Sequence, residues 1–256
     1  MHITVVTLFP EEVKVLGSFG VLGQAVRKGL VELETVDPRS FATDIHRTVD
    51  DRPYGGGPGM VMKVEPLRSA IQAARREAPD GTRVVVTSAQ GRLFDQSVAW
   101  KMAEAPGIIL VAGRYEGIDE RLIELEADDE VSIGDYVLSG GELPAMVVAD
   151  AVARLVPGVL GEAESARQDS FENGLLDCPH YTRPEEAGGL RVPGVLLSGD
   201  HGAIADWRRA EALRRTAVRR PDLLRRRGMT NEEEALLEEF ETGPGGSGQN
   251  GKRDSG

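Results

Sequence analysis

Short apolar runs alternate along this chain with amphipathic segments, and this alternation limits its possible folds more than any other feature. Residues 83–87 and 108–112 are rich in valine, isoleucine and leucine, and predict strands that are buried on both faces. Residues 64–78 carry apolar side chains at the three- and four-residue spacing of a helix. Alternating strands and helices predict an α/β fold with a mostly parallel sheet covered by helices on both faces.

The same patterns place the other elements of an α/β unit that ends near residue 160. Strands are expected at 1–8 and 31–36, and short extended segments at 130–133 and 136–138. Helices are expected at 95–105, 118–125 and 142–156. An aspartate begins the first of these helices, and Pro157 stops the last.

Composition changes beyond the α/β unit, 1–160, and divides the rest of the chain into three parts. Residues 161–175 are small and polar and predict a flexible linker. Residues 176–240 contain proline-rich turns and then helical patterns at 206–217 and 231–240, which predict a small, mainly helical domain. Residues 241–256 are glycine-rich, and predict a disordered tail.

Charge is distributed unevenly along the chain. The net charge is −12, but nine arginines lie between Arg208 and Arg227 against only two acids, a local balance of +7 that leaves −19 for the rest. Phosphate backbones respond to local positive potential rather than to net charge, so this segment is a candidate RNA contact surface. Composition alone leaves a solvated, arginine-rich helix face as an equal alternative.

Several classes of protein are excluded. The longest apolar stretch, 145–156, is interrupted by Asp150 and Arg154, so no segment could span a bilayer. The first residues lack the basic region and cleavage site of a signal peptide. Cys178 is the only cysteine, which rules out an intrachain disulfide and fits a reducing compartment. We therefore expect a cytoplasmic protein with no membrane partner.

Three glycine-bearing loops each follow a predicted strand: 87–91, 112–121 and 132–142. Ligands of open α/β sheets bind beyond the carboxyl ends of the strands, so the three loops are expected to form one pocket. Their backbone amides and carbonyls could read the edge of an adenine. A purely structural role for these glycines is the alternative.

A further glycine cluster, 54–60, precedes these loops. It lacks the Gly-Lys-Ser/Thr of a P-loop, and Met60 stands where a dinucleotide fingerprint has its last glycine. Two interpretations stay open, a tight structural turn and a loop that closes on a ligand or a partner subunit.

Polar residues in the second half of the chain are ambiguous when taken alone. Arg154 lies in the last turn of an apolar helix, where its charge meets the helix dipole, and Asp169 lies in the linker, where a carboxylate is usually solvated. Residues 175–184 combine an acid, a histidine, an aromatic and an arginine, as in a recognition loop. Cys178 and His180 are too close in sequence for good nucleophile–base geometry.

At these residues the sequence resembles the bacterial tRNA (guanine-N1)-methyltransferases of the trefoil-knotted SPOUT superfamily. The resemblance covers about residues 1–227. It is carried by the strings 54–60, 113–121, 132–144, 169–171, 175–184 and 193–199.

This resemblance implies a SPOUT-type sheet whose three loops form a C-terminal trefoil knot, and S-adenosylmethionine bound in that knot. The implied cofactor contacts are Ser88, Gly113, Gly117, Ser132, Ile133, Gly134, Asp135, Tyr136, Val137, Leu138, Gly140, Gly141 and Pro144. One departure is Ala89, where family members often have proline.

The implied reaction is methylation of N1 of the guanine immediately 3′ of the anticodon. Guanine N1 carries a proton, so a general base is needed, and the resemblance assigns this role to Asp169. It assigns to Arg154 the stabilisation of the negative charge that develops on O6. It also implies a response to Mg²⁺, for which Glu116 is the candidate ligand.

The resemblance further implies a homodimer, with the tRNA site between one subunit's knot and the other's C-terminal domain. The implied tRNA contacts are Arg114, Tyr115, Glu116, Asp177, His180, Ser198, Arg214, Arg215, Arg219 and Arg220.

Three other functions compete with this one. A ribose 2′-O-methyltransferase or rRNA enzyme of the same superfamily is disfavoured by the C-terminal strings. A non-catalytic RNA-binding module is disfavoured because both Asp169 and Arg154 are present. A nucleotide-binding oxidoreductase is disfavoured because no glycine fingerprint follows the first strand.

Overall fold

The computed structural model describes residues 1–161 and 169–242, which belong to two compact units. Unit 1 comprises Met1–Ala166, and unit 2 comprises Arg167–Gly256. The division falls within the segment expected to be a linker. Residues 162–168 of that segment, and 243–256 of the tail that was expected to be disordered, lie outside the described residues.

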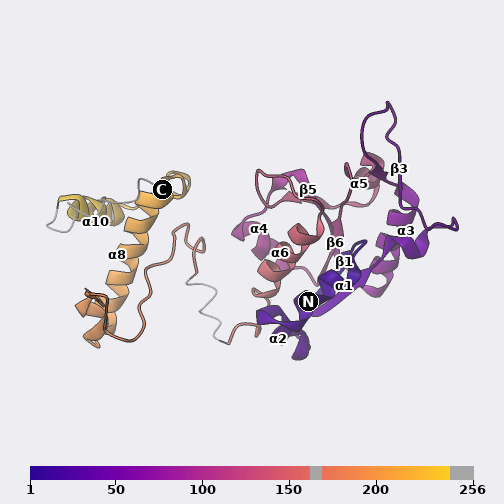
Figure 1. The fold of residues 1–256 in the computed structure, drawn as a ribbon. Coiled ribbons are helices and arrows are strands. Elements are labelled where there is room, and N and C mark those ends of the chain that lie inside the picture. Colours follow the sequence, from indigo (N-terminus) through magenta and orange to yellow (C-terminus); the bar gives the residue numbers. More distant parts are fainter. Residues whose placement is uncertain (162–168, 243–256) are drawn as a thin grey trace. The chain divides into compact units, whose positions relative to one another are not determined.

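A five-stranded sheet forms the centre of unit 1 (Figure 1). Its order is β2 (Glu32–Val36), β1 (His2–Val6), β6 (Gly107–Ala112), β5 (Arg83–Leu93) and β7 (Asp129–Ser132). Every neighbouring pair is parallel, which confirms the expected mostly parallel sheet. All residues of β1 and β6 are buried, as the continuous apolar run of β6 predicts, and β1 buries the polar residues His2 and Thr4 as well.

Helices cover both faces of this sheet. Those of unit 1 are α1 (Pro10–Lys14), α2 (Gly20–Arg27), α3 (Val64–Glu77), α4 (Gln96–Ala103), α5 (Glu120–Glu126) and α6 (Glu142–Ala153). Along β6, Ile108 and Leu110 pack with α2, α4 and α6, while Ile109 packs on the opposite face with α3 and α5. This alternation follows from the two-residue period of a strand, and it creates two apolar layers, one on each face of the sheet.

Several boundaries differ from expectation. Strand β5 continues to Leu93, so much of the expected loop 87–91 is strand. The pairing of β5 with β7 shifts register between Thr87 and Arg92, both of which pair with Val131. A β-carbon on Gly91 would lie 2.4 Å from the amide nitrogen of Val131, so the two strands meet closely only with glycine there.

Further differences concern the short elements of unit 1. The expected extended segment at 136–138 is wrong, since these residues form bends and loop. Helix α6 ends at Ala153 rather than at residue 156. Helices α1 and α2, and the 3₁₀ turns Val15–Ser18 and Pro38–Phe41, were not expected, although α2 carries Leu22, Ala25 and Val26 at helical spacing.

The glycine cluster 54–60 lies between two short antiparallel strands, β3 (Asp50–Asp51) and β4 (Val61–Met62). The Met62 amide donates to the Gly117 carbonyl at 2.9 Å, and the Glu116 amide donates to the Met60 carbonyl at 2.9 Å. The cluster is therefore anchored beside the loop that follows β6.

Within its described residues, 169–242, unit 2 contains the helices α8 (His201–Arg219), α9 (Pro221–Arg227) and α10 (Asn231–Thr242). It also contains a small hairpin, β8 (Glu186–Ala187) with β9 (Leu190–Arg191), and a 3₁₀ turn at Gly194–Leu197. Asp200 caps α8 by accepting from the amides of Gly202 and Ala203 at 3.0 and 3.1 Å, so this helix begins earlier than the expected residue 206.

Candidate functional site

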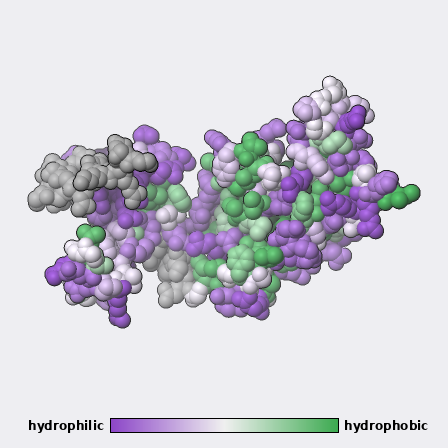
Figure 2. Space-filling view, viewed as in Figure 1, coloured by the Kyte–Doolittle hydropathy of each residue, from purple (hydrophilic) through white to green (hydrophobic). Residues whose placement is uncertain are grey.

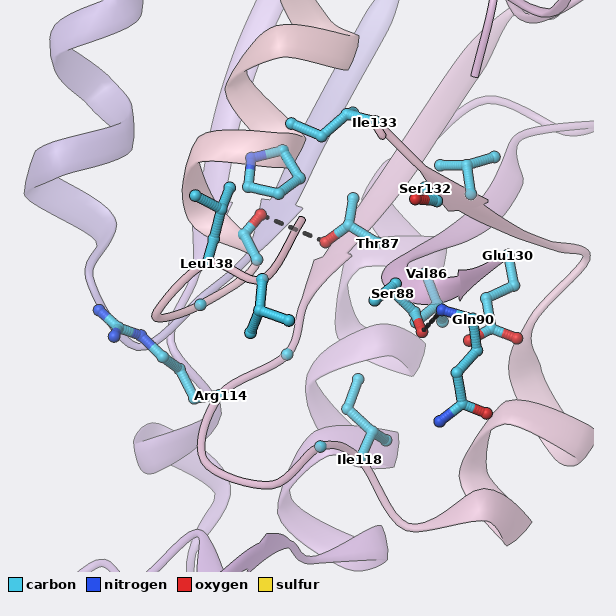
Figure 3. Close-up of a pocket in the computed structure, with 18 of the residues that line it drawn as sticks. Val86, Thr87, Ser88, Gln90, Arg114, Ile118, Glu130, Ser132, Ile133 and Leu138 are labelled. Carbon is cyan, nitrogen blue, oxygen red and sulfur yellow. Dashed lines mark hydrogen bonds between the residues drawn. The ribbon is translucent and has the colours of Figure 1, made fainter. Parts of the chain in front are cut away.

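Residues 86–90 of β5 and the loops beyond β6 and β7 meet in one pocket of about 240 Å³ (Figure 3). Parallel strands end at the same edge of a sheet, which is why segments far apart in sequence converge here. The pocket is lined by Val86–Gln90, by most of 113–123, by 130–141 except Asp135, and by Pro144. This convergence agrees with the pocket expected from the three loops.

Glycines allow the second and third loops to touch. The Gly141 amide donates to the Gly113 carbonyl at 2.7 Å. A β-carbon on Gly141 would lie 2.5 Å from the Thr87 hydroxyl oxygen and 2.7 Å from the Gly113 nitrogen, so no larger residue fits without a shift. The Thr87 hydroxyl also lies 3.2 Å from the Gly141 carbonyl (Figure 3).

The third loop turns sharply and presents apolar side chains. The Ser132 hydroxyl accepts from the Gly134 amide at 3.2 Å, and the Tyr136 amide donates to the Gly134 carbonyl at 2.9 Å. Beyond this turn Val137 is 91% exposed and Leu138 is also exposed, and both line the pocket. Exposed apolar side chains at a pocket rim are available to contact a ligand.

The charged groups of the pocket are mostly acidic. Glu116, Glu120 and Glu130 line it together with one cation, Arg114. The Arg114 guanidinium lies 3.1 Å from the Glu142 carboxylate, outside the lining, so its charge is already partly compensated. The pocket thus suits a cationic ligand better than the pyrophosphate of a dinucleotide.

Tyr115 occupies an unusual backbone conformation in the second loop, with φ of +62°. Burial raises the pKa of its hydroxyl, and nearby Asp50 raises it further. The phenol is therefore neutral at physiological pH and can donate a hydrogen bond.

Most residues that the resemblance assigned to the cofactor line this pocket. They are Ser88, Gly113, Gly117, Ser132, Ile133, Gly134, Tyr136, Val137, Leu138, Gly140, Gly141 and Pro144. Asp135 is the exception, since its side chain is exposed and lies outside the lining.

Three residues assigned to tRNA line the same pocket: Arg114, Tyr115 and Glu116. Nine lining residues were not assigned a role individually, although several lie in the loops expected to form the pocket: Val86, Thr87, Gln90, Ile118, Glu120, Ile123, Glu130, Val131 and Ser139. Most of these residues lie within one to three positions of an assigned residue. Extending the assignment to the neighbours of each assigned residue would therefore have identified them from the sequence.

Arg154 and Asp169 lie in different units. Arg154 is the half-buried residue that closes α6, and its amide donates to the Asp150 carbonyl at 3.2 Å. Asp169 is the first described residue of unit 2 and is also half-buried. Neither unit alone brings the two side chains together.

Asp177 and His180 form a polar pair in unit 2. His180 Nε2 lies 2.7 Å from the Asp177 carboxylate, which also accepts from the Cys178 amide at 2.7 Å. Burial acts to raise the pKa of Asp177, but these hydrogen bonds outweigh it and leave the pKa below its ordinary value. Ser198 lies apart from this pair, and its hydroxyl donates to the Val195 carbonyl at 2.7 Å.

The arginines of unit 2 are not equivalent. Arg214 pairs with Glu211 at 2.7 Å, and Arg220 pairs with Asp222 at 2.7 Å. Arg215 and Arg219 form no salt bridge with any residue that the structure describes. Part of the local positive charge is therefore neutralised within the chain, and Arg215 and Arg219 are the more available cations.

Glu116 is the candidate metal ligand. The Glu116 side chain packs against Gly59, where a β-carbon would lie only 2.2 Å from Glu116 Oε1. The absence of a side chain at Gly59 therefore leaves room for this carboxylate. Within 1–161 and 169–242, a group of three ligand atoms close enough to share an ion occurs at Asp177, Cys178 and His180, within 4.8 Å of one another. Glu116 is not part of that group.

Comparison with known proteins identifies the family to which a chain with this pocket belongs. The sequence profile of the tRNA (Guanine-1)-methyltransferase TrmD family matches residues 1–226. The chain belongs to the tRNA (guanine-1)-methyltransferase family. Its membership makes it an enzyme of the methyltransferase class rather than an oxidoreductase or a non-catalytic binding module.

Curated relatives of this tRNA (guanine-1)-methyltransferase family member are similar over nearly their full length. The tRNA (guanine-N(1)-)-methyltransferase of Methylococcus capsulatus is 63% identical over 240 residues, which cover 94% of this chain and 96% of the relative. The enzymes of the same name from Shewanella amazonensis and Shewanella denitrificans are 59% and 58% identical, with coverage of 94% of this chain and 96% and 97% of their own.

The helices of this family member were compared with the requirements for a membrane span. None of the described helices has both the length and the apolar character needed to cross a bilayer.

Proposed function

We propose that this chain transfers a methyl group from S-adenosylmethionine to N1 of the guanine immediately 3′ of the anticodon in tRNA. The observation that carries the proposal is the pocket formed by residues 86–90 of β5 and the loops beyond β6 and β7, in a chain of this methyltransferase family. No other class of function proposed from the sequence accounts for both.

The pocket has the features needed to hold S-adenosylmethionine. Gly113, Gly134 and Gly141 carry no side chain, so the loops that line the pocket can approach a ligand closely. Val137 and Leu138 supply apolar contact, and the acidic lining favours a cation. Bound there, S-adenosylmethionine supplies an electrophilic methyl group on a positively charged sulfonium.

The proposal extends to a trefoil knot formed by the three loops. Two observations support it. The third loop is bonded to the second through Gly141 and Gly113, and β7 pairs with β5 on both sides of the register shift between Thr87 and Arg92. Knots are rare, and periodicity alone does not predict them.

In the proposed mechanism Asp169 accepts the N1 proton of the guanine. Loss of this proton leaves a lone pair on N1 and spreads negative charge to O6, which Arg154 stabilises as a fixed cation. Glu116 is the proposed contact for Mg²⁺, since carboxylate oxygens are the ligands this ion takes. Asp177, His180 and Ser198 are proposed to contact the tRNA together with the arginines of α8.

A homodimer completes the proposed site. Helix α6 carries Leu143 and Val147 exposed on its surface, and apolar residues gather over this part of unit 1 (Figure 2). Exposed apolar patches of this kind mark interaction sites. Asp169 of one chain would then act at the pocket of its partner, in a cytoplasmic enzyme.

The test is mass spectrometry of an unmodified tRNA transcript incubated with the full chain and S-adenosylmethionine. The expected product carries one methyl group on the guanine base 3′ of the anticodon, and a transcript with adenine at that position stays unmethylated. A methyl group on a ribose would instead favour a 2′-O-methyltransferase, and no methylation at all would overturn the proposal.

A further inference from the structure

Arg114 was expected to contact tRNA, but its side chain is engaged inside the protein. Its Nη1 donates to the Ser139 carbonyl at 2.9 Å, and its Nε lies 3.1 Å from the Glu142 carboxylate. Its guanidinium carbon lies 4.3 Å from the centre of the Phe9 ring, in cation–π contact. Figure 3 shows the side chain pointing away from the centre of the pocket, toward the loop that carries Leu138.

Glu142, the partner of Arg114, is itself fixed to the sheet. Only 8% of this residue is exposed, and its Oε1 accepts from the hydroxyl of Thr7, which is fully buried. The Thr7 hydroxyl oxygen also accepts from the Phe9 amide at 3.0 Å. Since Thr7 directly follows β1, the pair Arg114–Glu142 rests on the rigid centre of unit 1.

Ser139, the other partner of Arg114, lies in the pocket loop and not in the core. It lies in the exposed stretch 135–139 of the third pocket loop, in which Tyr136 bonds only to nearby loop residues. The bond from Arg114 therefore ties a loop with few anchors to the buried Glu142–Thr7 pair. Gly140 leaves the space for this bridge, because a β-carbon there would lie 2.6 Å from Arg114 Nε and from Glu142 Oε2.

We infer that Arg114, held by Glu142, is a positioning residue that keeps the loop 136–140 in the shape that binds the methyl donor. A loop ordered before binding costs less conformational entropy when the ligand arrives. The inference rests on the proposed function, because it concerns the S-adenosylmethionine pocket. It differs from a direct tRNA contact, which would leave donor binding unchanged.

Calorimetry and kinetics on the full chain test this role with Arg114→Gln and Glu142→Gln. Each variant should raise the Kd and KM for S-adenosylmethionine roughly tenfold. Arg114→Gln removes the charge-assisted hydrogen bond to the Ser139 carbonyl, and Glu142→Gln removes the carboxylate that faces the buried Arg114 Nε, which forms no hydrogen bond with any residue that the structure describes. The affinity of donor-free enzyme for tRNA should stay within about twofold of the parent, since neither variant removes a group that binds phosphate. The double variant should be no worse than the weaker single variant, because both act through one bridge.

Arg121→Gln is the matched control. Arg121 lies in the first turn of α5, directly after the loop that carries Arg114, and also pairs with an acid, Asp119, at 2.7 Å, but it is largely exposed and lies outside the pocket lining. Its replacement should leave the Kd for S-adenosylmethionine unchanged. Gly140→Ala provides a second route, because the added methyl group would push Arg114 and Glu142 apart without removing either, and should also weaken donor binding.

Three outcomes separate the possibilities, with circular dichroism melting used to establish that each variant is folded. Unchanged donor binding in Arg114→Gln with weakened tRNA binding would overturn the inference in favour of a direct RNA contact. Losses that multiply in the double variant would also overturn it. A parent enzyme that neither binds S-adenosylmethionine nor methylates tRNA would instead overturn the proposed function, before any variant is compared.

Discussion

The amide of Gly141 donates to the carbonyl of Gly113 at 2.7 Å, which joins the loop after β7 to the loop after β6. This single backbone bond closes the side of the pocket where the two loops would otherwise separate. It requires that residue 141 have no side chain, because the Thr87 hydroxyl and the Gly113 backbone occupy the space of a β-carbon.

Gly141→Ala should therefore reduce both stability and donor binding. Forcing a methyl group into this contact should cost about 1–3 kcal/mol of the free energy of unfolding, as overpacking does. Urea unfolding measures this change, and calorimetry measures the Kd for S-adenosylmethionine. Gly161→Ala is the control, because its β-carbon would meet nothing within 4 Å. Equal stability of the two variants would contradict the steric argument.

Asp169→Asn should lower the rate of methyl transfer by roughly 10² to 10⁴, since the amide keeps the shape of the side chain but cannot accept the N1 proton as a carboxylate does. Binding of tRNA and S-adenosylmethionine should persist. Single-turnover kinetics at saturating tRNA provide the measurement, with the exposed Asp80→Asn as an isosteric control. A variant within about threefold of the parent rate would show that the proton leaves by another route.

Arg154→Ala should slow the same step by removing the cation proposed to stabilise O6. If Asp169 and Arg154 serve one proton-transfer step, the double variant should be much less impaired than the product of the two single losses. The same single-turnover experiment checks this. Independent, multiplicative losses would assign the two residues to separate steps.

Replacing Arg214, Arg215, Arg219 and Arg220 by alanine should weaken tRNA binding and reduce its dependence on salt, by about one unit of slope for each phosphate interaction removed. The pair Arg215/Arg219 should account for most of the change, because Arg214 and Arg220 are engaged with Glu211 and Asp222. Binding isotherms at several salt concentrations test this. An unchanged slope in the quadruple variant would exclude this surface as the RNA site.

Asp222 titrates unusually low. Its hydrogen bonds from Arg220 lower the pKa of its carboxyl to about 2. A lowered pKa means that this pair stabilises the junction of α8 and α9 above the ordinary pKa of 3.8, and that the contribution disappears as the pH falls through about 2. In Arg220→Gln the pKa should return toward 3.8, whereas Arg219→Gln should leave it low. A carboxyl titration followed by NMR distinguishes these outcomes.

Light scattering at micromolar concentration should give the mass of a dimer. Leu143→Glu with Val147→Glu should produce monomers, because charges placed on an apolar interface oppose association. Loss of methylation should accompany loss of the dimer if Asp169 acts on the partner's pocket. A monomer that still methylates tRNA would rule out a site shared between two chains.

The sheet was predictable because residues 84–86 of β5 and 108–112 of β6 are continuous apolar runs, and such runs are buried in a parallel sheet. The polar second half of β5 was expected to be a loop, because it carries no such run. The position of the pocket was predictable for a related reason, since the ends of parallel strands share one edge. The strand order was not, because nothing local in β1 specifies that β2 and β6 flank it.

Side-chain partners were the least predictable part of the site. Arg114 lies in a loop that was expected to contact a ligand, but its guanidinium contacts Glu142 and the Phe9 ring. These residues lie 28 positions later and 105 positions earlier in the chain. Arg214 and Arg220 pair with acids that lie three and two positions away in the sequence. Closeness in sequence alone does not show which arginines of this segment form such pairs. Roles that depend on tertiary neighbours therefore required the structure.

The position of β1 between β2 and β6 constrains how the protein can fold during synthesis. Residues 2–6 need β6, which ends at Ala112, before both edges of the strand are hydrogen-bonded. At about 5–20 residues per second, the ribosome takes on the order of ten seconds to supply that partner. During this interval an apolar strand with an open edge is exposed to wrong pairing, and it is the point at which a nascent chain of this kind would most depend on a chaperone.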